Sequence, residues 1–480
     1  MIKRLIAKYF GVTSDKCMYD TIIIGGGPGG YVCAIRAAQL GGNVCLIEKN
    51  GLGGTCTQRG CIPTKYLHSL GDTMRRAARA KNSGLNIQIE LNYKLLKSKM
   101  YATVSRLASG IKLLLESNGV DLVKGEAHIV SANKVAVNDI MIETKNIVIA
   151  TGSYPICLQG YEFGENILST NSILELKDLP KSITIIGGGY SGCEFASILN
   201  ALGCKVSLIE AEDHLLPFQI KEIGNAVEKY MTLDGINVMT KSRVEKIIDN
   251  IAFVNGGEKL VAEKILICIG RRPNINPNEL NNIGIKFDQQ QGICVDKKMR
   301  TNIHNVYAIG DVTGIYELAH VASKQGEVAA ENIMVGTKDD DGDDNNNGDH
   351  NIDYRALPVC IFTHPEVAFV GDLHGGSGEF PLAASAKANC LGDTRGFMKV
   401  FEKEGKLVGT YIIAPHAGEI IGEAALAIKM NLSLKDIFYT IHAHPTLPES
   451  FAEAIRDINS EAIHLPIKTT RDRIHKSIHP

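Results

Sequence analysis

The chain has 480 residues, 44% hydrophobic and 22% charged, a composition typical of a soluble protein with more than one domain. Its net charge of −2 gives no electrostatic reason to expect nucleic acid or a membrane surface as a partner, and no apolar run reaches the ~18–20 residues of a membrane-spanning helix. Twelve cysteines are too few for a disulfide scaffold, so most are expected to be reduced and buried.

The first 18 residues are rich in Lys and Arg but lack the apolar segment of a secretory signal. They are interpreted either as the remnant of an organelle-targeting leader or as a disordered start.

Two segments repeat one pattern at an offset of 162 residues: TIIIGGGPGG…LGGNVCLIE (21–48) and TIIGGGYSG…LGCKVSLIE (184–210). Each reads as a strand, a GxGxxG turn, a helix and a second strand that ends in a carboxylate. The glycines allow a tight turn, approach of a pyrophosphate and close helix packing, and the carboxylate is placed for ribose hydroxyls. A single copy could be a glycine-rich turn of any α/β protein, but two aligned copies predict two dinucleotide sites. The candidate residues are Gly25, Gly27, Gly30 and Glu48 in the first copy and Gly187, Gly189, Gly192 and Glu210 in the second.

The segment GGTCTQRGCIPTK (53–65) places two cysteines five residues apart, just behind the first copy. Fully extended, Cys56 and Cys61 would be ~16 Å apart, whereas a disulfide needs Cα atoms within ~7 Å, so the segment must coil. Pro63 suits the first turn of a helix, which would put Cys61 near its positive end and lower the pKa of the thiol. Lys65 would lie one turn further along the same face. A zinc site would need a second pair at ligand spacing, so a redox pair is favoured over a zinc site, a structural bridge or core cysteines.

Three further stretches read as strands that return to the two sheets: IVIATGSYP (147–155), ILICIGRRP (265–273) and NVYAIGDV (305–312). The last of them leaves Asp311 free to reach a ribityl or ribose hydroxyl. After Glu210 the chain continues with Glu212 and Asp213 and has no Arg, which disfavours a 2′-phosphate and therefore favours NAD over NADP.

Near the end of the chain, IHAHPTLPESFAEAIR (441–456) allows three interpretations. Thr446 and Glu449 could form a capping box at a helix that begins after Thr446. Glu449 could instead orient His444 as a base that removes a thiol proton. A metal pair of His442 and His444 ranks third, and on the residues alone the cap is favoured.

Together these motifs resemble the flavoprotein disulfide reductases, and the stretches around the cysteines and around HAHPTLPE resemble the dihydrolipoamide dehydrogenases among them. The resemblance runs from about Tyr19 to about Pro466. It implies that Cys56 exchanges with substrate, that Cys61 contacts the flavin, and that Lys65 pairs with Glu194. It also implies that His444 and Glu449 form the active-site base of the partner subunit, and therefore a homodimer.

The resemblance also implies the cofactors and their contacts. FAD is expected at Gly25, Gly27, Gly30, Glu48, Gly54, Thr55, Lys65, Gly125, Thr151, Gly152, Ser153, Asp311, Leu318, Ala319 and His320. NAD is expected at Gly187, Gly189, Gly192, Glu194, Glu210, Val244 and Gly270, and no metal site is expected.

The fold class implied is α/β, with two Rossmann-like dinucleotide-binding domains, for FAD and NAD, and a C-terminal α+β dimerisation domain. The predicted boundaries are 1–18 leader or disordered N-terminus, 19–154 FAD-binding domain, 155–275 NAD-binding domain, 276–336 segment completing the FAD domain, 337–353 disordered acidic and Asn-rich insertion, 354–466 interface domain and 467–480 polar tail. The stretch LHGGSGEF after residues 370–372 departs from the family, which has a short amphipathic helix there.

The implied activity is that of a dihydrolipoyl dehydrogenase, which oxidises protein-bound dihydrolipoyl groups to lipoyl and reduces NAD to NADH. The implied partners are the lipoyl domains and the acyltransferase or binding-protein subunit of 2-oxoacid dehydrogenase complexes, or the glycine cleavage system. A mitochondrial matrix or other organelle is the expected location, with bacterial cytoplasm as the alternative. Three alternatives are less favoured. Glutathione-type reductases would need basic residues after Glu210, and mercuric reductases would need a C-terminal cysteine pair. A non-catalytic architectural flavoprotein would have no need of the two cysteines together with His444 and Glu449.

Overall fold

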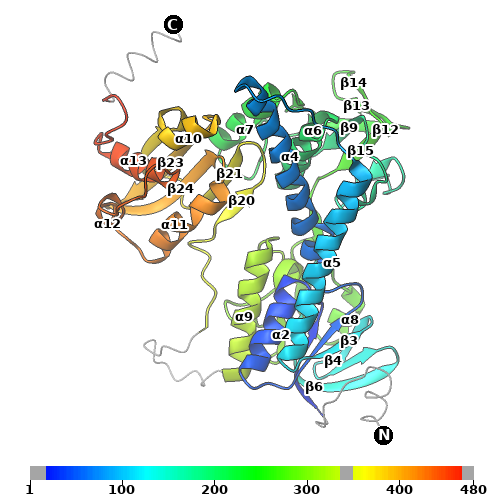
Figure 1. The fold of residues 1–480 in the computed structure, drawn as a ribbon. Helices are drawn as coiled ribbons and strands as arrows, with labels where there is room; N and C mark the ends of the chain where they lie inside the picture. The colour runs from blue at the N-terminus through cyan, green and yellow to red at the C-terminus, as the bar shows by residue number, and fades with distance from the viewer. Residues whose placement is uncertain (1–17, 336–349, 468–480) are drawn as a thin grey trace.

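The computed structural model describes residues 18–335 and 350–467, which form three packed units (Figure 1). The predicted N-terminal leader, most of the acidic insertion and nearly all of the polar tail lie outside the described residues. Within the described part, no helix combines the length and the apolar character that crossing a bilayer requires.

The first unit is built on a sheet that is parallel on one side and antiparallel on the other. In order, its strands are β3 (Asp121–Lys124), β2 (Val44–Glu48), β1 (Tyr19–Ile24), β6 (Ile140–Ile149), β5 (Lys134–Val137) and β4 (Ala127–Ser131), and β19 (Val306–Ala308) also pairs with β6. The central parallel strands are almost continuous apolar runs because both of their faces are covered. β19 comes from beyond the second unit, so the chain leaves this sheet and returns to complete it.

Helices α2 (Pro28–Gln39) and α9 (Ala319–Val335) lie side by side against this sheet (Figure 1). Their backbones come so close that a Cβ on Gly326 would lie 2.4 Å from the carbonyl oxygen of Gly29. The short 3-10 helix η2 (Gly310–Thr313) leads from β19 toward α9.

Three helices follow β2 and connect the first unit to the second: α3 (Gly54–Arg59), α4 (Cys61–Asn82) and α5 (Tyr93–Ser117). In Figure 1, α4 and α5 extend from the first unit to the upper half of the molecule. α4 packs on the second unit, where Arg75 donates a hydrogen bond to the carbonyl oxygen of Ser197 at 2.7 Å. The helix that begins at Cys61 is thereby anchored in both units.

The second unit repeats the topology of the first. Its parallel strands are, in order, β11 (Asn237–Met239), β10 (Lys205–Ile209), β9 (Ser182–Ile186), β15 (Lys264–Ile267) and β8 (Ile167–Leu168), accompanied by α6 (Tyr190–Ala201), α7 (Lys221–Leu233) and the 3-10 helix η1 (Ser172–Glu175). A separate antiparallel sheet contains β12 (Val244–Ile248), β13 (Ile251–Val254) and β14 (Lys259–Val261).

Short elements join the two units. β7 (Ser153–Pro155) pairs antiparallel with β16 (Arg271–Pro273), so the strands that follow β6 and β15 meet each other. They are followed by α8 (Pro277–Asn282), β17 (Phe287–Asp288) and β18 (Gly292–Ile293).

The C-terminal unit is an antiparallel sheet with helices. Its strands are, in order, β20 (Val359–Ile361), β21 (Glu366–Gly371), β24 (Lys406–Ala414), β23 (Phe397–Lys403) and β22 (Gly376–Pro381), and its helices are α10 (Ala386–Leu391), α11 (Ala417–Lys429), α12 (Leu434–Phe438), α13 (Pro448–Ile458) and the 3-10 helix η3 (Leu382–Ala384). One set of its apolar side chains packs into the core of the second unit, and another packs against α11 and α13. The predicted fold class is confirmed.

The glycine-rich segment after residue 372 forms an edge strand, β22, and not the amphipathic helix that the resemblance implies. α13 lies against this strand so closely that a Cβ on Gly378 would be 2.2 Å from the carbonyl oxygen of Ala454. Gly378 therefore allows the helix to pack on the strand.

The prediction that residues 337–353 form a disordered insertion is wrong for residues 350–353. Residues 350–353 are packed: Ile352 is buried, and Asp353 forms an ion pair with Lys429 at 2.7 Å. The buried Ile352 and the ion pair of Asp353 with Lys429 hold this stretch in place. The Asp- and Asn-rich composition of the insertion indicates neither contact.

Candidate active site

A cavity of about 600 Å³ lies in the first unit, between the glycine turn after β1 and the turns that follow β6 and β19. The predicted residues that line it are Gly25, Gly27, Glu48, Gly54, Thr55, Gly125, Thr151, Gly152, Ser153, Asp311 and Ala319. Cys56 and Cys61 line it as well. The structure therefore brings the cysteine pair and the first nucleotide motif to one place.

The glycines of the first motif create backbone surfaces that no side chain could share. A Cβ on Gly25 would lie 2.3 Å from the carbonyl oxygen of Ala150, and one on Gly54 would lie 2.7 Å from the Cα of Gly27. α2 begins without a side-chain cap, so its first N–H groups are free to bind an anion. A long cavity with bare backbone at a helix start fits FAD, whose pyrophosphate would lie at the start of α2.

Glu48 and Asp311 are fixed at this cavity by hydrogen bonds. Glu48 accepts from the N–H groups of Gly26 at 2.7 Å and Asn50 at 2.6 Å. Asp311 accepts from the Ser153 hydroxyl at 2.6 Å, and Arg271 donates to that hydroxyl at 2.7 Å.

Sequence reasoning missed Arg271 and Glu317, which also line the cavity. Arg271 belongs to the stretch assigned to the second sheet, and only the β7–β16 pairing brings it back to the first unit. Glu317 immediately precedes the predicted flavin-contacting turn, and burial raises the pKa of its carboxyl group.

Four of the residues predicted to contact FAD do not line the cavity. Gly30 allows close packing instead, since a Cβ there would lie 1.8 Å from the carbonyl oxygen of Gly25. Leu318 packs against the core shared by the second and third units, and Nε2 of His320 lies 2.9 Å from the carbonyl oxygen of Pro358. Lys65, the fourth, forms an ion pair with Glu194.

The two thiols lie at the junction of α3 and α4, and α4 begins at Cys61. Both are free, and the Cys56 thiol donates a hydrogen bond to the Cys61 sulfur. This bond lowers the pKa of Cys61 to about 7, with burial acting in the opposite direction and the positive charge of Lys65 acting in the same one. The same bond, together with burial, raises the pKa of Cys56. The pair therefore consists of one thiolate-forming sulfur at a helix start and one protonated neighbour.

Lys65 and Glu194 form the ion pair that the resemblance implies. Nζ of Lys65 lies 2.8 and 3.0 Å from the two carboxylate oxygens of Glu194, and the Glu194 side chain is only 13% exposed. Phe362 holds both partners, because its N–H donates to Glu194 at 3.0 Å and its ring lies 4.3 Å from Nζ of Lys65. One residue from each of the three units therefore meets next to Cys61.

His444 and Glu449 are also joined, at 2.8 Å between Nδ1 and Oε1. The second carboxylate oxygen accepts from the N–H of Thr446 at 2.6 Å. The predicted capping box is only half present, because the Thr446 hydroxyl donates to the carbonyl oxygen of Ala443 and not to the helix. α13 begins at Pro448, and the proline ring at this position removes an N–H that a cap would otherwise have to satisfy.

The His444 side chain is 71% exposed, and neither it nor Glu449 lines the cavity that contains the cysteines. Within one chain, the described residues therefore place the His–Glu pair outside the redox site.

The second glycine motif repeats the geometry of the first. A Cβ on Gly192 would lie 1.8 Å from the carbonyl oxygen of Gly187, and the space around Gly189 is open. Glu210 is buried and accepts from the N–H groups of Gly188 at 2.6 Å and Glu212 at 2.8 Å. The start of α6 has no side-chain cap, so this motif also fits the pyrophosphate of a dinucleotide.

Two other residues predicted for NAD lie at the edges of the second unit. Val244 begins β12 and packs against an apolar cluster, and Gly270 occupies the left-handed backbone region with φ +117°. Lysines from distant positions also approach the acidic loop: Nζ of Lys221 lies 2.5 Å from Asp213, and the N–H of Lys241 donates to the carbonyl oxygen of Glu212. No Arg follows Glu210 in the sequence, but lysine residues from outside this loop add positive charge near it.

Comparisons with known proteins agree with this geometry. Residues 19–326 match the pyridine nucleotide-disulphide oxidoreductase family, and residues 357–455 match the dimerisation domain of that family. The chain is 38% identical over 470 residues to the dihydrolipoyl dehydrogenase of Chlamydia pneumoniae, covering 94% of this chain and 99% of that protein. It is 37% identical over 472 residues to the dihydrolipoyl dehydrogenase of Geobacillus stearothermophilus, covering 94% and 98%.

Solved structures show the same fold. LpdA from Mycobacterium tuberculosis superposes with a TM-score of 0.82 at 25% identity, covering 91% of this chain and 99% of that one. The flavoprotein disulfide reductase RclA from Escherichia coli superposes with a TM-score of 0.79 at 24% identity, covering 91% and 99%, and shows a likeness of fold alone.

These matches confirm several sequence predictions. The cofactors predicted, FAD and NAD, are those of this family of disulfide oxidoreductases, and a dimerisation domain indicates the predicted homodimer. The relatives named above are bacterial, so they give no support to a mitochondrial location. With two nucleotide units and a dimerisation domain matched over most of its length, the chain belongs to the pyridine nucleotide-disulphide oxidoreductase family.

Proposed function

We propose that this protein is a dihydrolipoyl dehydrogenase, which oxidises dihydrolipoyl groups on lipoyl domains and reduces NAD to NADH. The observation that carries the proposal is the polarised pair of Cys56 and Cys61, which lines the cavity of the first unit beside the Lys65–Glu194 ion pair. The extent of the likeness to dihydrolipoyl dehydrogenases supports the choice of substrate.

In the proposed reaction the enzyme begins with Cys56 and Cys61 joined as a disulfide. A dihydrolipoyl thiolate attacks the sulfur of Cys56, a new S–S bond forms, and Cys61 leaves as a thiolate. The second dihydrolipoyl thiol then displaces Cys56, so that the lipoyl disulfide is released and two electrons remain on the enzyme dithiol. The start of α4 and Lys65 stabilise the negative charge on Cys61. When bound, FAD supplies the two-electron chemistry between the dithiol and NAD.

The substrate thiol needs a base, and His444 is the proposed one. Glu449 accepts a hydrogen bond from Nδ1 of His444, which leaves Nε2 to take the proton. Because this pair lies outside the cavity of its own chain, a second copy in the homodimer would present it to the cysteines.

The partners of this reaction belong to the same proposal. A lipoyl domain would bring its substrate arm to the cavity, and the acyltransferase or binding-protein subunit of a 2-oxoacid dehydrogenase complex would hold the dimer. Cytoplasm of a bacterium or an organelle matrix would both be compatible with this role.

A steady-state assay of the FAD-loaded dimer tests the proposal. With free dihydrolipoamide, we expect NADH formation with a kcat/KM for NAD at least about tenfold above that for NADP, because the fixed Glu210 carboxylate after β10 disfavours a 2′-phosphate. Glutathione disulfide with NADPH serves as the competing pair. Turnover of that pair without oxidation of dihydrolipoamide would replace the proposal with a glutathione-type reductase, and an FAD-loaded dimer inactive with both would favour an architectural flavoprotein.

Glu449→Gln separates the base from the helix start. The Gln amide oxygen can still accept from the N–H of Thr446, so the melting temperature should stay near that of the wild type. Loss of the carboxylate that orients His444 should lower turnover by more than about tenfold, since a positioned base contributes ~10²–10⁴-fold. Thr446→Ala is the matched control, because it removes the hydroxyl bond to Ala443 and leaves the carboxylate in place. Full turnover of Glu449→Gln would remove Glu449 from the mechanism.

A further inference from the structure

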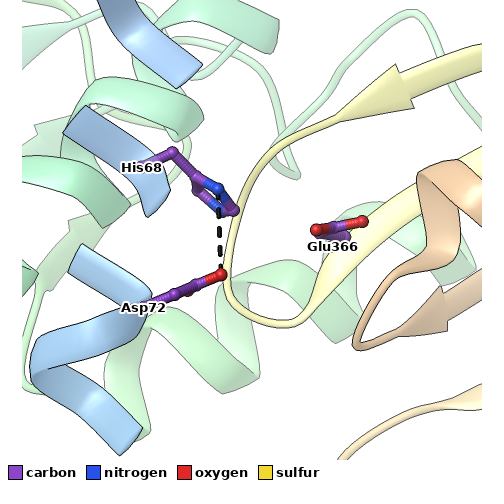
Figure 2. A group of neighbouring side chains, drawn as sticks. All are labelled: His68, Asp72 and Glu366. Atoms are coloured by element: carbon purple, nitrogen blue, oxygen red, sulfur yellow. Dashed lines mark ion pairs between the residues drawn. The ribbon is translucent and has the colours of Figure 1, made fainter. Parts of the chain in front are cut away.

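A second group of polar side chains lies on α4, beyond Lys65. His68 and Asp72 extend from this helix toward Glu366, the first residue of β21, and one possible ligand atom from each lies within 4.8 Å of the other two (Figure 2). His68 is 6% exposed, so its imidazole is enclosed by protein. None of the three residues has a role in the proposed reaction.

The contact of Nε2 with the backbone sets the orientation of the His68 ring. Nε2 lies 3.4 Å from the carbonyl oxygen of Thr363, which can only accept, so Nε2 is engaged with the backbone and Nδ1 is the ring nitrogen left to face the cluster. Nδ1 points to Asp72, whose Oδ2 lies 3.8 Å away (Figure 2). A histidine that donates one N–H to a backbone carbonyl and turns the other nitrogen to a cluster of oxygens has the orientation of a metal ligand.

The two carboxylates are held in the same manner. Oδ1 of Asp72 accepts from Arg75 at 3.2 Å, and Oε2 of Glu366 accepts from the N–H of Gly418 at 3.1 Å. Each carboxylate is therefore held in position by a hydrogen bond to one of its oxygens.

We propose that His68, Asp72 and Glu366 bind a divalent transition-metal ion of the Zn²⁺ type, with water completing the coordination. One nitrogen and two carboxylate oxygens form a ligand set that suits such an ion, and three protein ligands leave one position of a tetrahedron open. Three atoms 4.8 Å apart lie about 2.8 Å from their common centre, against ~2.0–2.2 Å for Zn–N and Zn–O bonds. Each ligand would thus move inward by less than ~1 Å.

The two carboxylates of the cluster border a small cavity. This cavity has a volume of about 90 Å³, larger than the ~30 Å³ share of one water molecule, and His68 does not line it. Two arginines also line this cavity: Arg79 pairs with Asp393 at 3.1 Å, and Arg76 lies 3.3 Å from Nε2 of His416.

The site would join the helix of the redox cysteines to the C-terminal unit. The His68 ring meets Phe362 edge-on with 5.7 Å between ring centroids, and the same Phe362 ring contacts Lys65. A bound ion would therefore fix the position of α4 against β21 next to the Lys65–Glu194 pair.

The test measures Zn²⁺ binding by the oxidised holoenzyme, in which Cys56 and Cys61 are joined and cannot act as ligands. Calorimetry of wild type, Glu366→Gln and His68→Gln is compared with Asp372→Asn. This control changes an exposed His–carboxylate pair, His374–Asp372 at 2.9 Å, which is not part of a three-ligand group among the described residues. We expect one ion per chain in the wild type and in Asp372→Asn. In both cluster variants we expect binding weakened by more than about tenfold.

Melting temperature gives a second measurement. Zn²⁺ should raise it in the wild type and in Asp372→Asn but not in the cluster variants, because an ion bound only by the folded state stabilises that state. If the wild type binds Zn²⁺ no more tightly than Glu366→Gln and His68→Gln do, the cluster is a His–carboxylate ion pair only and the proposal is wrong.

Discussion

The two nucleotide units share one backbone plan down to single hydrogen bonds. The strand order β3-β2-β1-β6 of the first unit corresponds to β11-β10-β9-β15 of the second. The N–H of Gly25 donates to Ile47 at 2.8 Å, and the N–H of Gly187 donates to Ile209 at the same distance. In each unit the glutamate at the end of the second strand accepts from the N–H that follows the first glycine.

The units differ in the loop that follows this glutamate. In both, a residue with positive φ returns to the glycine turn and donates its N–H at 2.8 Å: Gly53 donates to Gly26, and Leu216 donates to Gly188. The first loop has no side chain at this point and continues into Cys56 and Cys61, which line the cavity. The second loop buries Leu215 and Leu216 completely. One scaffold therefore becomes a redox centre or a simple dinucleotide site through the side chains of this loop.

The largest expected effect comes from the third glycine of each motif. A Cβ would lie 1.8 Å from a carbonyl oxygen at both Gly30 and Gly192, and such overpacking costs ~1–3 kcal/mol or more. Gly30→Ala should lose bound FAD, whereas Gly192→Ala should keep its flavin and bind NADH more than about tenfold more weakly. Flavin absorbance per chain and NADH titration measure the two effects. Loss of flavin from both variants alike would show that the units do not bind their cofactors independently.

The glutamates should give the next largest effect. Glu48 accepts from three N–H groups and Glu210 from two, and Gln would keep one acceptor oxygen and turn its amide group toward a remaining donor, at a cost of ~1.5–3 kcal/mol. Because Glu210 is the more buried of the two, Glu210→Gln should lower the melting temperature more than Glu48→Gln does. Glu210→Gln should also weaken NADH binding about tenfold, since a ribose partner is lost. The comparison would be broken if Glu48→Gln weakened NADH binding as strongly as Glu210→Gln did.

The pH dependence of the thiols tests the loop of the first unit. With its pKa lowered to about 7, Cys61 of the reduced enzyme is mainly a thiolate above that pH and becomes protonated as the pH falls through 7. Cys56→Ala removes the donor that lowers this pKa, so the midpoint of Cys61 alkylation should move to higher pH. Cys56→Ser keeps a hydroxyl donor and should stay close to 7. Equal midpoints in the two variants would mean that Lys65 and the helix start, without Cys56, set the pKa.

The smallest effect is expected at the first helical residue, which is Pro28 in the first unit and Tyr190 in the second. The Tyr190 hydroxyl accepts from Gln219 at 2.8 Å, and one such bond contributes about 1 kcal/mol. Tyr190→Phe should lower the melting temperature slightly and leave the flavin content unchanged. A flavin-depleted Tyr190→Phe protein would show that this residue also supports the first site.

Local patterns were sufficient for much of the site. The duplicated GxGxxG turns predicted both nucleotide units, because the backbone at each third glycine excludes any side chain. Pro63 predicted the helix that begins at Cys61, since proline is compatible only with the first turn. Resemblance to a family, and not the residues themselves, supplied the pairing of Lys65 with Glu194, which lies 129 positions away.

Other features became visible only in three dimensions. Thr446 and Glu449 fit a capping box by spacing, yet Glu449 uses one oxygen for a backbone N–H and the other for His444. Sequence spacing shows which residues share a helix turn, but it does not show which hydrogen-bond partner a side chain will choose when several are in reach.

The sequence by itself therefore determined the two nucleotide units, the reactive cysteine pair and the helix that carries it, because each depends on backbone conformation within a short segment. Only the tertiary structure decided that Arg271 supports Ser153 at the first site, that Phe362 joins Lys65 and Glu194, and that Glu366 faces His68. These contacts connect segments that are far apart in the chain. Packing between units creates them, and no periodicity or local motif specifies which distant side chains will meet.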